Sequence, residues 1–138
     1  RVTRCPCQPR SSGPVFSRNG ERHWVRWPEG GEFQLVQAML ADCETECAAA
    51  KALVLDAARR KDTGEKVTKA AAMCKYYASE MVGRVADRAV QIHGGAGYVS
   101  DYAIERFYRD VRLFRIYEGT TQIQQIVIAR NMIRDIQV

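Results

Sequence analysis

Apolar side chains recur at alternating steps of three and four residues from position 33, and this period constrains the fold more than any other feature of the sequence. Such spacing lines one face of an α-helix with apolar groups. We therefore expect a long amphipathic helix whose apolar face must pack against another element. The residues of this stripe are Phe33, Val36, Leu40, Cys43, Cys47, Ala50, Val54 and Ala57.

A charged turn at residues 61–65, with Gly64 at its tip, separates this pattern from a second one. Glycine at such a point is typical of the connection between two antiparallel helices. Gly94 and Gly95 should end the second helix, because glycine readily adopts the backbone conformation that follows a helix. The second stripe consists of Ala71, Cys74, Ala78, Met81, Val85, Ala89 and Ile92.

Two shorter patterns complete the chain. We expect Asp101 to cap a short helix and Thr120 or Thr121 to begin the last helix. No βαβ alternation is visible, so the predicted fold is all-α, an up-and-down helical bundle of three long helices and one short helix. The apolar positions of the short helix are Ile104, Phe107, Tyr108, Val111 and Leu113. The last helix is expected to turn one face inward, formed by Ile123, Ile126, Val127, Arg130 and Ile133.

The first 32 residues differ in composition from the rest. They contain all four prolines, both tryptophans and no apolar period. We expect an irregular leader at residues 1–32 and one helical domain at residues 33–138. The leader holds six basic and three acidic side chains, so the domain carries only +2 of the net charge of +5. No Lys/Arg stripe with interleaved aromatic residues supports nucleic-acid binding.

Cysteine spacing and hydropathy narrow the class of protein further. The five cysteines fit neither a zinc module nor a disulfide framework, and Cys5-Pro6-Cys7 is too closely spaced for ordinary bridging. We expect Cys43, Cys47 and Cys74 to be small buried hydrophobic residues in a reducing compartment. No apolar run approaches the ~18 residues of a membrane span, which predicts a soluble protein. A di-metal bundle would need Glu-x-x-His pairs, and Val90 precedes His93 by three positions, so no metal site is expected.

One carboxylate, Glu118, lies between the apolar pair Ile116-Tyr117 and a glycine. Apolar neighbours keep water from a carboxylate, which suits a base, and Gly119 lets the backbone approach a ligand closely. The helix start that follows would direct backbone N–H groups at the same place. Taken alone, the stretch could also be a turn followed by a helix cap. A second glycine-rich stretch, residues 91–98, favours a ligand site but could be a helix C-cap.

Three motifs together resemble the C-terminal helical domain of the acyl-CoA dehydrogenase family of flavoproteins. They are Gln91-x-x-Gly94-Gly95-x-Gly97-Tyr98, Glu105-Arg106-x-x-Arg109-Asp110 and Ile116-Tyr117-Glu118-Gly119-Thr120. The resemblance covers about residues 33–137 and implies a fragment of a longer FAD-dependent enzyme. It assigns Glu118 as the base that removes the α-proton of an acyl-CoA thioester, while a hydride passes from the β-carbon to flavin N5.

The resemblance also implies the binding residues and the partners. Gly119 would face the acyl-CoA, and the partners would be a second copy in a homodimer or homotetramer and an electron-transferring flavoprotein as electron acceptor. The expected location is a bacterial cytoplasm, with the mitochondrial matrix as the alternative. Three groups of residues would contact FAD. Gln34 would do so near the start of the domain, and Thr120, Thr121 and Gln122 would lie along the diphosphate. The adenine half of a flavin held mainly by a neighbouring subunit would meet Gln91, Ile92, His93, Gly94 and Gly95.

Two alternatives remain at this stage. The chain could be a non-catalytic helical assembly module that binds no flavin, because amphipathic helices cut from a larger protein expose apolar faces. The charged residues Arg106, Arg109, Asp110 and Arg112 could bind phosphate, but we expect them to form a salt-bridged scaffold around the Glu118 loop.

Overall fold

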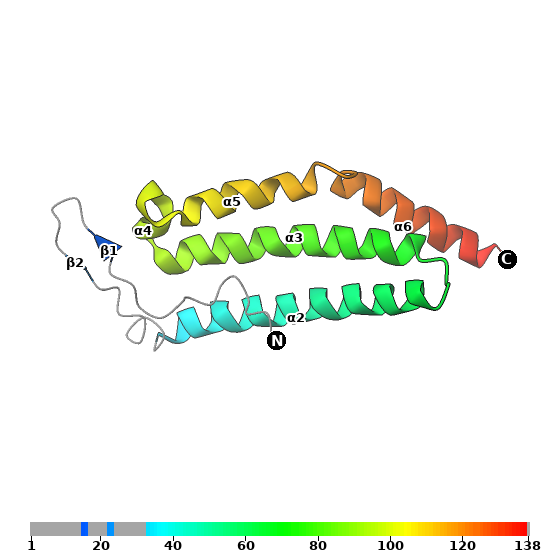
Figure 1. Ribbon diagram of the computed structural model, residues 1–138, viewed down its shortest axis with the longest axis horizontal. Helices are drawn as coiled ribbons and strands as arrows, with labels where there is room; N and C mark the ends of the chain where they lie inside the picture. Colours follow the sequence, from blue (N-terminus) through cyan, green and yellow to red (C-terminus); the bar gives the residue numbers. More distant parts are fainter. Residues whose placement is uncertain (1–14, 17–21, 24–32, 138) are drawn as a thin grey trace.

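The computed structural model describes residues 15–16, 22–23 and 33–137 (Figure 1). The expected all-α fold is confirmed. The α-helices are α2 (Gln34–Asp62), α3 (Thr68–His93), α4 (Gly95–Tyr98), α5 (Ile104–Arg112) and α6 (Thr121–Ile136), with 3₁₀ turns η1 (Ser100–Tyr102) and η2 (Leu113–Arg115).

A pair of very short strands lies within the segment that was expected to be irregular. β1 (Val15–Phe16) pairs antiparallel with β2 (Arg22–His23), with Val15 opposite His23. The sequence pattern did not reveal this pair, because two residues are too few for a strand period to be visible. The rest of the leader, including Cys5 and Cys7, lies outside the described residues.

α3 is the middle element of the molecule. Figure 1 shows α2 running along one side of α3, with α5 and α6 following one another along the other side. α3 contacts α2, α5 and α6, so the up-and-down helices form a single layer around it. The residues buried between α3 and its neighbouring helices are small, which allows the helix axes to approach closely. They include Cys43, Ala50 and Ala57 of α2 and Ala70, Ala72, Ser79 and Ala86 of α3.

A single layer leaves large apolar side chains at the surface. Within the described residues no large side chain is fully buried. The expected inward face of α6 was largely wrong, since Ile123, Ile126 and Ile133 are exposed and only Val127 among its apolar members is half-buried. The side of α6 toward α3 instead includes Thr121, Gln124, Ile128 and Asn131. None of the described helices is long and apolar enough to cross a membrane.

Most helix ends follow the sequence signals. Gly64 in the α2–α3 turn and Gly94 after α3 both have positive φ angles, 83° and 57°. Thr120 caps α6, because its hydroxyl oxygen accepts a hydrogen bond of 3.4 Å from Ile123 N. The expected cap at Asp101 is wrong. Asp101 lies inside η1, and α5 begins after Ala103, which turns the chain with a φ of 58° and makes no side-chain cap.

Candidate active site

The loop between η2 and α6 presents Glu118. Two hydrogen bonds to Leu113 O, from Ile116 N at 2.9 Å and from Tyr117 N at 3.2 Å, tighten the chain as η2 ends. Glu118 and Gly119 then adopt consecutive positive φ angles of 55° and 84°, which turn the chain into α6. The left-handed conformation costs a non-glycine residue about 1–2 kcal/mol. The surrounding structure must therefore hold Glu118 in place.

Two side chains hold the middle of this loop. Lys75 of α3 donates a hydrogen bond of 2.6 Å from Nζ to Gly119 O, and Gln124 of α6 donates from Nε2 to Glu118 O at 3.2 Å. A Cβ atom at position 119 would lie 2.7 Å from Gln124 Nε2. Gly119 is therefore favoured by its φ angle, and a Cβ there would displace the Gln124 amide from its hydrogen bond to Glu118 O.

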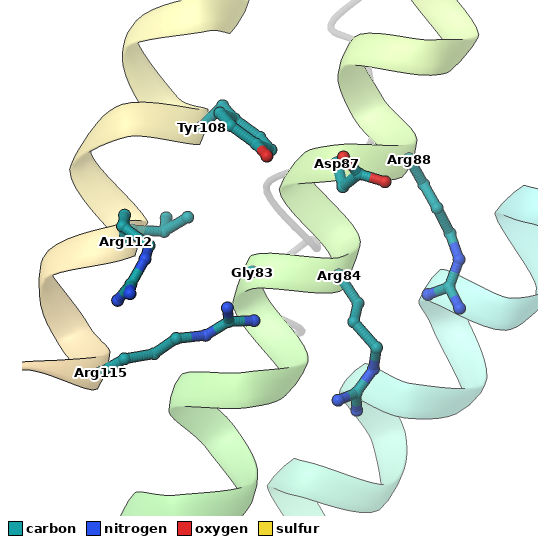
Figure 2. Close-up of a pocket in the computed structure, with 8 residues that line it drawn as sticks. Gly83, Arg84, Asp87, Arg88, Tyr108, Arg112 and Arg115 are labelled. Carbon is teal, nitrogen blue, oxygen red and sulfur yellow. The ribbon is translucent and has the colours of Figure 1, made fainter. Parts of the chain in front are cut away.

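Glu80 of α3 connects the two ends of the same loop. Arg115, before the loop, places Nε 3.1 Å from Glu80 Oε2 and donates from Nη2 to Glu80 O at 3.3 Å. Thr121, after the loop, donates from Oγ1 to Glu80 Oε1 at 2.8 Å. Figure 2 shows the Arg115 side chain reaching across to α3 at Gly83. A Cβ atom on Gly83 would lie 2.4 Å from Arg115 Nη2, so the glycine makes room for the guanidinium.

Sequence reasoning missed Lys75, Glu80 and Gln124 as supports of the loop. Lys75 and Glu80 are separated from the loop by most of α3 and all of α5, so no local pattern connects them with Glu118. Gly83 was the one available signal, because a glycine inside a helix is unfavourable and often marks a close approach.

The Glu118 side chain lies at the surface of the described part of the chain. Its neighbours Ile116 and Tyr117 are 53% and 45% exposed, and the Tyr117 ring stacks on Phe114 at 5.8 Å between centroids. These groups form an apolar rim beside the carboxylate but do not enclose it. The water exclusion expected from the sequence therefore requires atoms beyond residues 33–137.

The second cluster of candidate residues surrounds the end of α3. Gln91, His93, Gly94 and Gly95 are exposed, and Ile92 is half-buried. His93 Nδ1 lies 2.7 Å from Ala89 O, the contact of a residue that finishes a helix. Apart from adjacent residues, no atom of the described part of the chain lies within 4 Å of where a Cβ on Gly94 or Gly95 would stand, so the backbone there is open to a ligand.

The two clusters lie far apart in one chain. Gln34 begins α2 at the same end of the molecule as the end of α3, whereas Thr120, Thr121 and Gln122 begin α6 near the middle (Figure 1). Lys75, which contacts the Glu118 loop, and Gln91 are separated by about 24 Å along α3 at 1.5 Å per residue. A single chain therefore presents two separate surfaces rather than one pocket.

A cleft of about 400 Å³ lies between α3 and the α5–η2 segment. In Figure 2 the Arg84 and Arg88 side chains point away from α5 and toward α2. There they donate to Glu46, from Arg84 Nε at 2.8 Å and from Arg88 Nη2 at 2.9 Å. The cleft is lined by Gly83, Arg84, Asp87, Arg88, Tyr108, Val111, Arg112 and Arg115.

The ion-paired scaffold differs from the expected one. Among residues 33–137, no ion pair includes Arg106, Arg109, Asp110 or Arg112. The pairs that connect the described helices are instead Arg84 and Arg88 with Glu46, Arg88 with Asp42, Lys69 with Asp135, and Arg115 with Glu80. Arg106, Arg109 and Asp110 are exposed, and Arg112 lines the cleft beside α3 without an ion-pair partner among the described residues.

The titrating groups inside the layer have structural rather than nucleophilic properties. Burial alone would raise the pKa of Glu46, but hydrogen bonds from Arg88 and Arg84 outweigh it and lower that pKa. Burial raises the pKa of the Cys43, Cys47 and Cys74 thiols, which keeps them protonated. Cys43 is buried and the other two are half-buried, in agreement with their expected role as small core residues.

Known proteins share this helical arrangement and sequence. Residues 23–133 match the family model described as acyl-CoA dehydrogenase, C-terminal domain. The chain is 52% identical to the 3-(aryl)acrylate reductase of Clostridium sporogenes and 48% identical to the caffeyl-CoA reductase-Etf complex subunit CarC of Acetobacterium woodii, each over 103 residues. Each alignment covers 27% of the relative, so the chain spans about a quarter of the length of these proteins.

A solved structure gives the same result. The butyryl-CoA dehydrogenase from Megasphaera elsdenii matches with a TM-score of 0.72 and 39% sequence identity. The match covers 75% of this chain and 27% of that chain.

Proposed function

The chain belongs to the acyl-CoA dehydrogenase family, and from this premise we propose that it supplies the catalytic base and part of the flavin site of an FAD-dependent acyl-CoA dehydrogenase. The observation that carries the proposal is the conformation of Glu118. Its backbone is held in a strained left-handed turn by contacts from α3 and α6, and such strain is concentrated at functional sites.

The residues of the chain fit a dinucleotide cofactor in two places. The first turn of α6 contains no acidic side chain, so its backbone N–H groups favour a phosphate. The open backbone at Gly94 and Gly95 allows a nucleotide to approach without meeting a side chain. Thr121 in the first turn of α6 contacts Glu80, which lies about 21 Å from Gly94 along α3 at 1.5 Å per residue, so we assign the two places to two different FAD molecules in a homodimer or homotetramer.

Glu118 performs the proton transfer in the proposed reaction. Its carboxylate removes the α-proton of an acyl-CoA thioester, while Gly119 leaves room for the substrate beside the base. Bound FAD supplies the hydride acceptor for the β-carbon. The apolar rim of Ile116 and Tyr117 completes a dry environment once further atoms cover it, which strengthens the electrostatic interactions there.

The proposed partners follow from the relatives. The Acetobacterium woodii relative is named as a subunit of a caffeyl-CoA reductase-Etf complex, which supports an electron-transferring flavoprotein as redox partner here. Relatives named as reductases and as dehydrogenases both carry this domain, so the same base could serve either direction of the reaction. The relatives named above are bacterial, which supports a bacterial cytoplasm as the location.

A rival function has one observation in its favour. Ile123, Ile126 and Ile133 form an exposed apolar row on α6, as would suit a helical assembly module that binds no flavin. Flavin binding separates the two functions, because assembly alone needs no nucleotide.

The test is a titration of the chain with FAD, followed by flavin absorbance and fluorescence, beside a Glu118→Gln variant. We expect saturable binding to both forms and weaker binding of riboflavin, which lacks the phosphates and the adenine. Acyl-CoA turnover, where it occurs, should be confined to the parent. Absence of FAD binding in both forms would favour the assembly module.

A further inference from the structure

We propose that Glu80 is a positioning residue that sets the orientation of Glu118 by holding both ends of the loop between Arg115 and Thr121. This inference rests on the proposed function and extends it to a residue on a different helix. Glu80 itself touches neither ligand nor reacting atoms in this role.

The two oxygens of one carboxylate are divided between the loop ends. Oε2 lies 3.1 Å from Arg115 Nε, and Oε1 accepts the 2.8 Å hydrogen bond from Thr121 Oγ1. Residues 116–120, with Glu118 among them, therefore form a closed span whose two ends meet at one side chain of α3. A change in the position of Glu80 would move both ends together.

The contacts lie largely away from solvent. Thr121 is buried, and the side chains of Arg115 and Glu80 are only 28% and 27% exposed. Salt and water screen such a pair less than they screen a fully exposed one. The pair is an ionic contact rather than an aligned hydrogen bond, since the buried Arg115 Nε has no hydrogen-bond partner. Removal of the Glu80 charge would thus remove the ionic contact that this nitrogen makes.

The loop needs such restraint because of the Glu118 backbone. A φ of 55° is unfavourable for glutamate, and a loop with free ends would relax toward negative φ. That relaxation would turn the carboxylate in a new direction. Lys75 fixes the middle of the loop at Gly119 O, and Glu80 fixes its ends, so the strained conformation is the one that satisfies all of these contacts.

Hydrogen exchange of the whole chain, measured without ligand, tests the inference in a Glu80→Gln variant. The reporting amides are Ile116, Tyr117, Ile123 and Gln124, whose N–H groups donate within or beside the loop. We expect their exchange to rise about tenfold, the effect of losing one charged contact, with little change in α2. Gly83→Ala should act in the same way, because the new Cβ displaces Arg115 while alanine favours the helix.

Glu46→Gln is the matched control. Glu46 also lies between helices and pairs with Arg84 and Arg88, but on the α2 side of α3. This variant should loosen the contact between α2 and α3 and leave the loop amides unchanged. If loop exchange stays at the parent level in both Glu80→Gln and Gly83→Ala, or rises equally in Glu46→Gln, the inference is overturned.

The outcomes separate this inference from the proposed function. If Glu80→Gln loosens the loop but the chain binds no FAD, the structural role of Glu80 is kept and the flavoenzyme proposal is removed. If the chain binds FAD and the loop is unchanged in Glu80→Gln, the flavoenzyme proposal is kept and the structural role of Glu80 is removed. Where turnover is measurable, Glu80→Gln should lower kcat with KM little changed, since it disturbs the orientation of the base rather than binding.

Discussion

At the scale of single residues, the site depends on backbone conformation as much as on side chains. Glu118 and Gly119 both have positive φ angles, yet only one of them is a glycine. The motif Glu-Gly-Thr indicated the flexible glycine and the threonine cap. It could not indicate that the backbone of the glutamate itself is strained. That conformation is held by contacts from Lys75 and Gln124, which are residues outside the motif.

Replacement of Gly119 by alanine should destabilise the protein by about 1.5–3.5 kcal/mol. Roughly 1–2 kcal/mol comes from the left-handed backbone, and about 0.5–1.5 kcal/mol from the hydrogen bond to Glu118 O that Gln124 loses when the new Cβ displaces its Nε2. The measurement is the free energy of unfolding in urea.

Gly64→Ala is the matched control for this prediction. Gly64 has nearly the same φ, 83° against 84°, but among the described residues nothing beyond its chain neighbours lies within 4 Å of the added Cβ. Its replacement should therefore cost only the backbone contribution. Equal losses of stability in the two variants would show that the contact with Gln124 contributes nothing.

At the scale of elements, the sequence predicted the helices well and their faces less well. The apolar period from Phe33 and the glycines at positions 64 and 94 located α2 and α3. The inward face of α6 was missed because Thr121 and Asn131, both polar, lie toward α3 while its isoleucines are exposed. Hydropathy alone cannot reveal this arrangement, since Thr121 is buried through its hydrogen bond to Glu80.

The contact between α2 and α3 should weaken in acid. The pKa of Glu46 lies below its ordinary value of 4.5 in the folded protein, so its stabilising effect is present above pH 4.5 and is lost as the pH falls through the folded pKa. Glu46→Gln should lower the free energy of unfolding by about 1–3 kcal/mol at pH 7, and by less near pH 3. Urea unfolding at both pH values measures the difference.

The control for the acid effect is Glu65→Gln. Glu65 pairs with Arg60 at an exposed turn, where solvent screens the ion pair. This variant should change stability little at either pH. A loss in Glu46→Gln that is the same at pH 3 as at pH 7 would contradict the assignment of the acid effect to Glu46.

At the scale of the whole molecule, the chain is a single layer of helices with open sides. Within the described residues, α2 packs on one side of α3 and α5 and α6 on another, and many large apolar side chains remain exposed. The two candidate ligand surfaces, at Gln91–Gly95 and at Glu118–Gln122, do not meet within one chain. Both features are those of a part that requires neighbours, and the chain spans about a quarter of the relatives it matches.

The family resemblance was visible in the sequence, and it implied that Gln91–Gly95 contact a flavin held mainly by a neighbouring subunit. The distance between this stretch and residues 115–122 in one folded chain was not visible, because only one short helix separates them in the sequence. In space, α4, η1 and α5 carry the chain back along α3, so the Glu118 loop lies toward the other end of that helix (Figure 1). The folded arrangement therefore shows that the two stretches form separate surfaces within one copy of the described residues.

The most direct test of the account is the activity of Glu118 within a complete enzyme. Residues 33–137 would replace the matching quarter of the butyryl-CoA dehydrogenase from Megasphaera elsdenii, and the chimera would be assayed with butyryl-CoA. We predict measurable oxidation and a fall in kcat of at least about a thousandfold in the Glu118→Gln chimera, with FAD still bound. A Glu118→Gln chimera as active as its parent would contradict the assignment of Glu118 as the base.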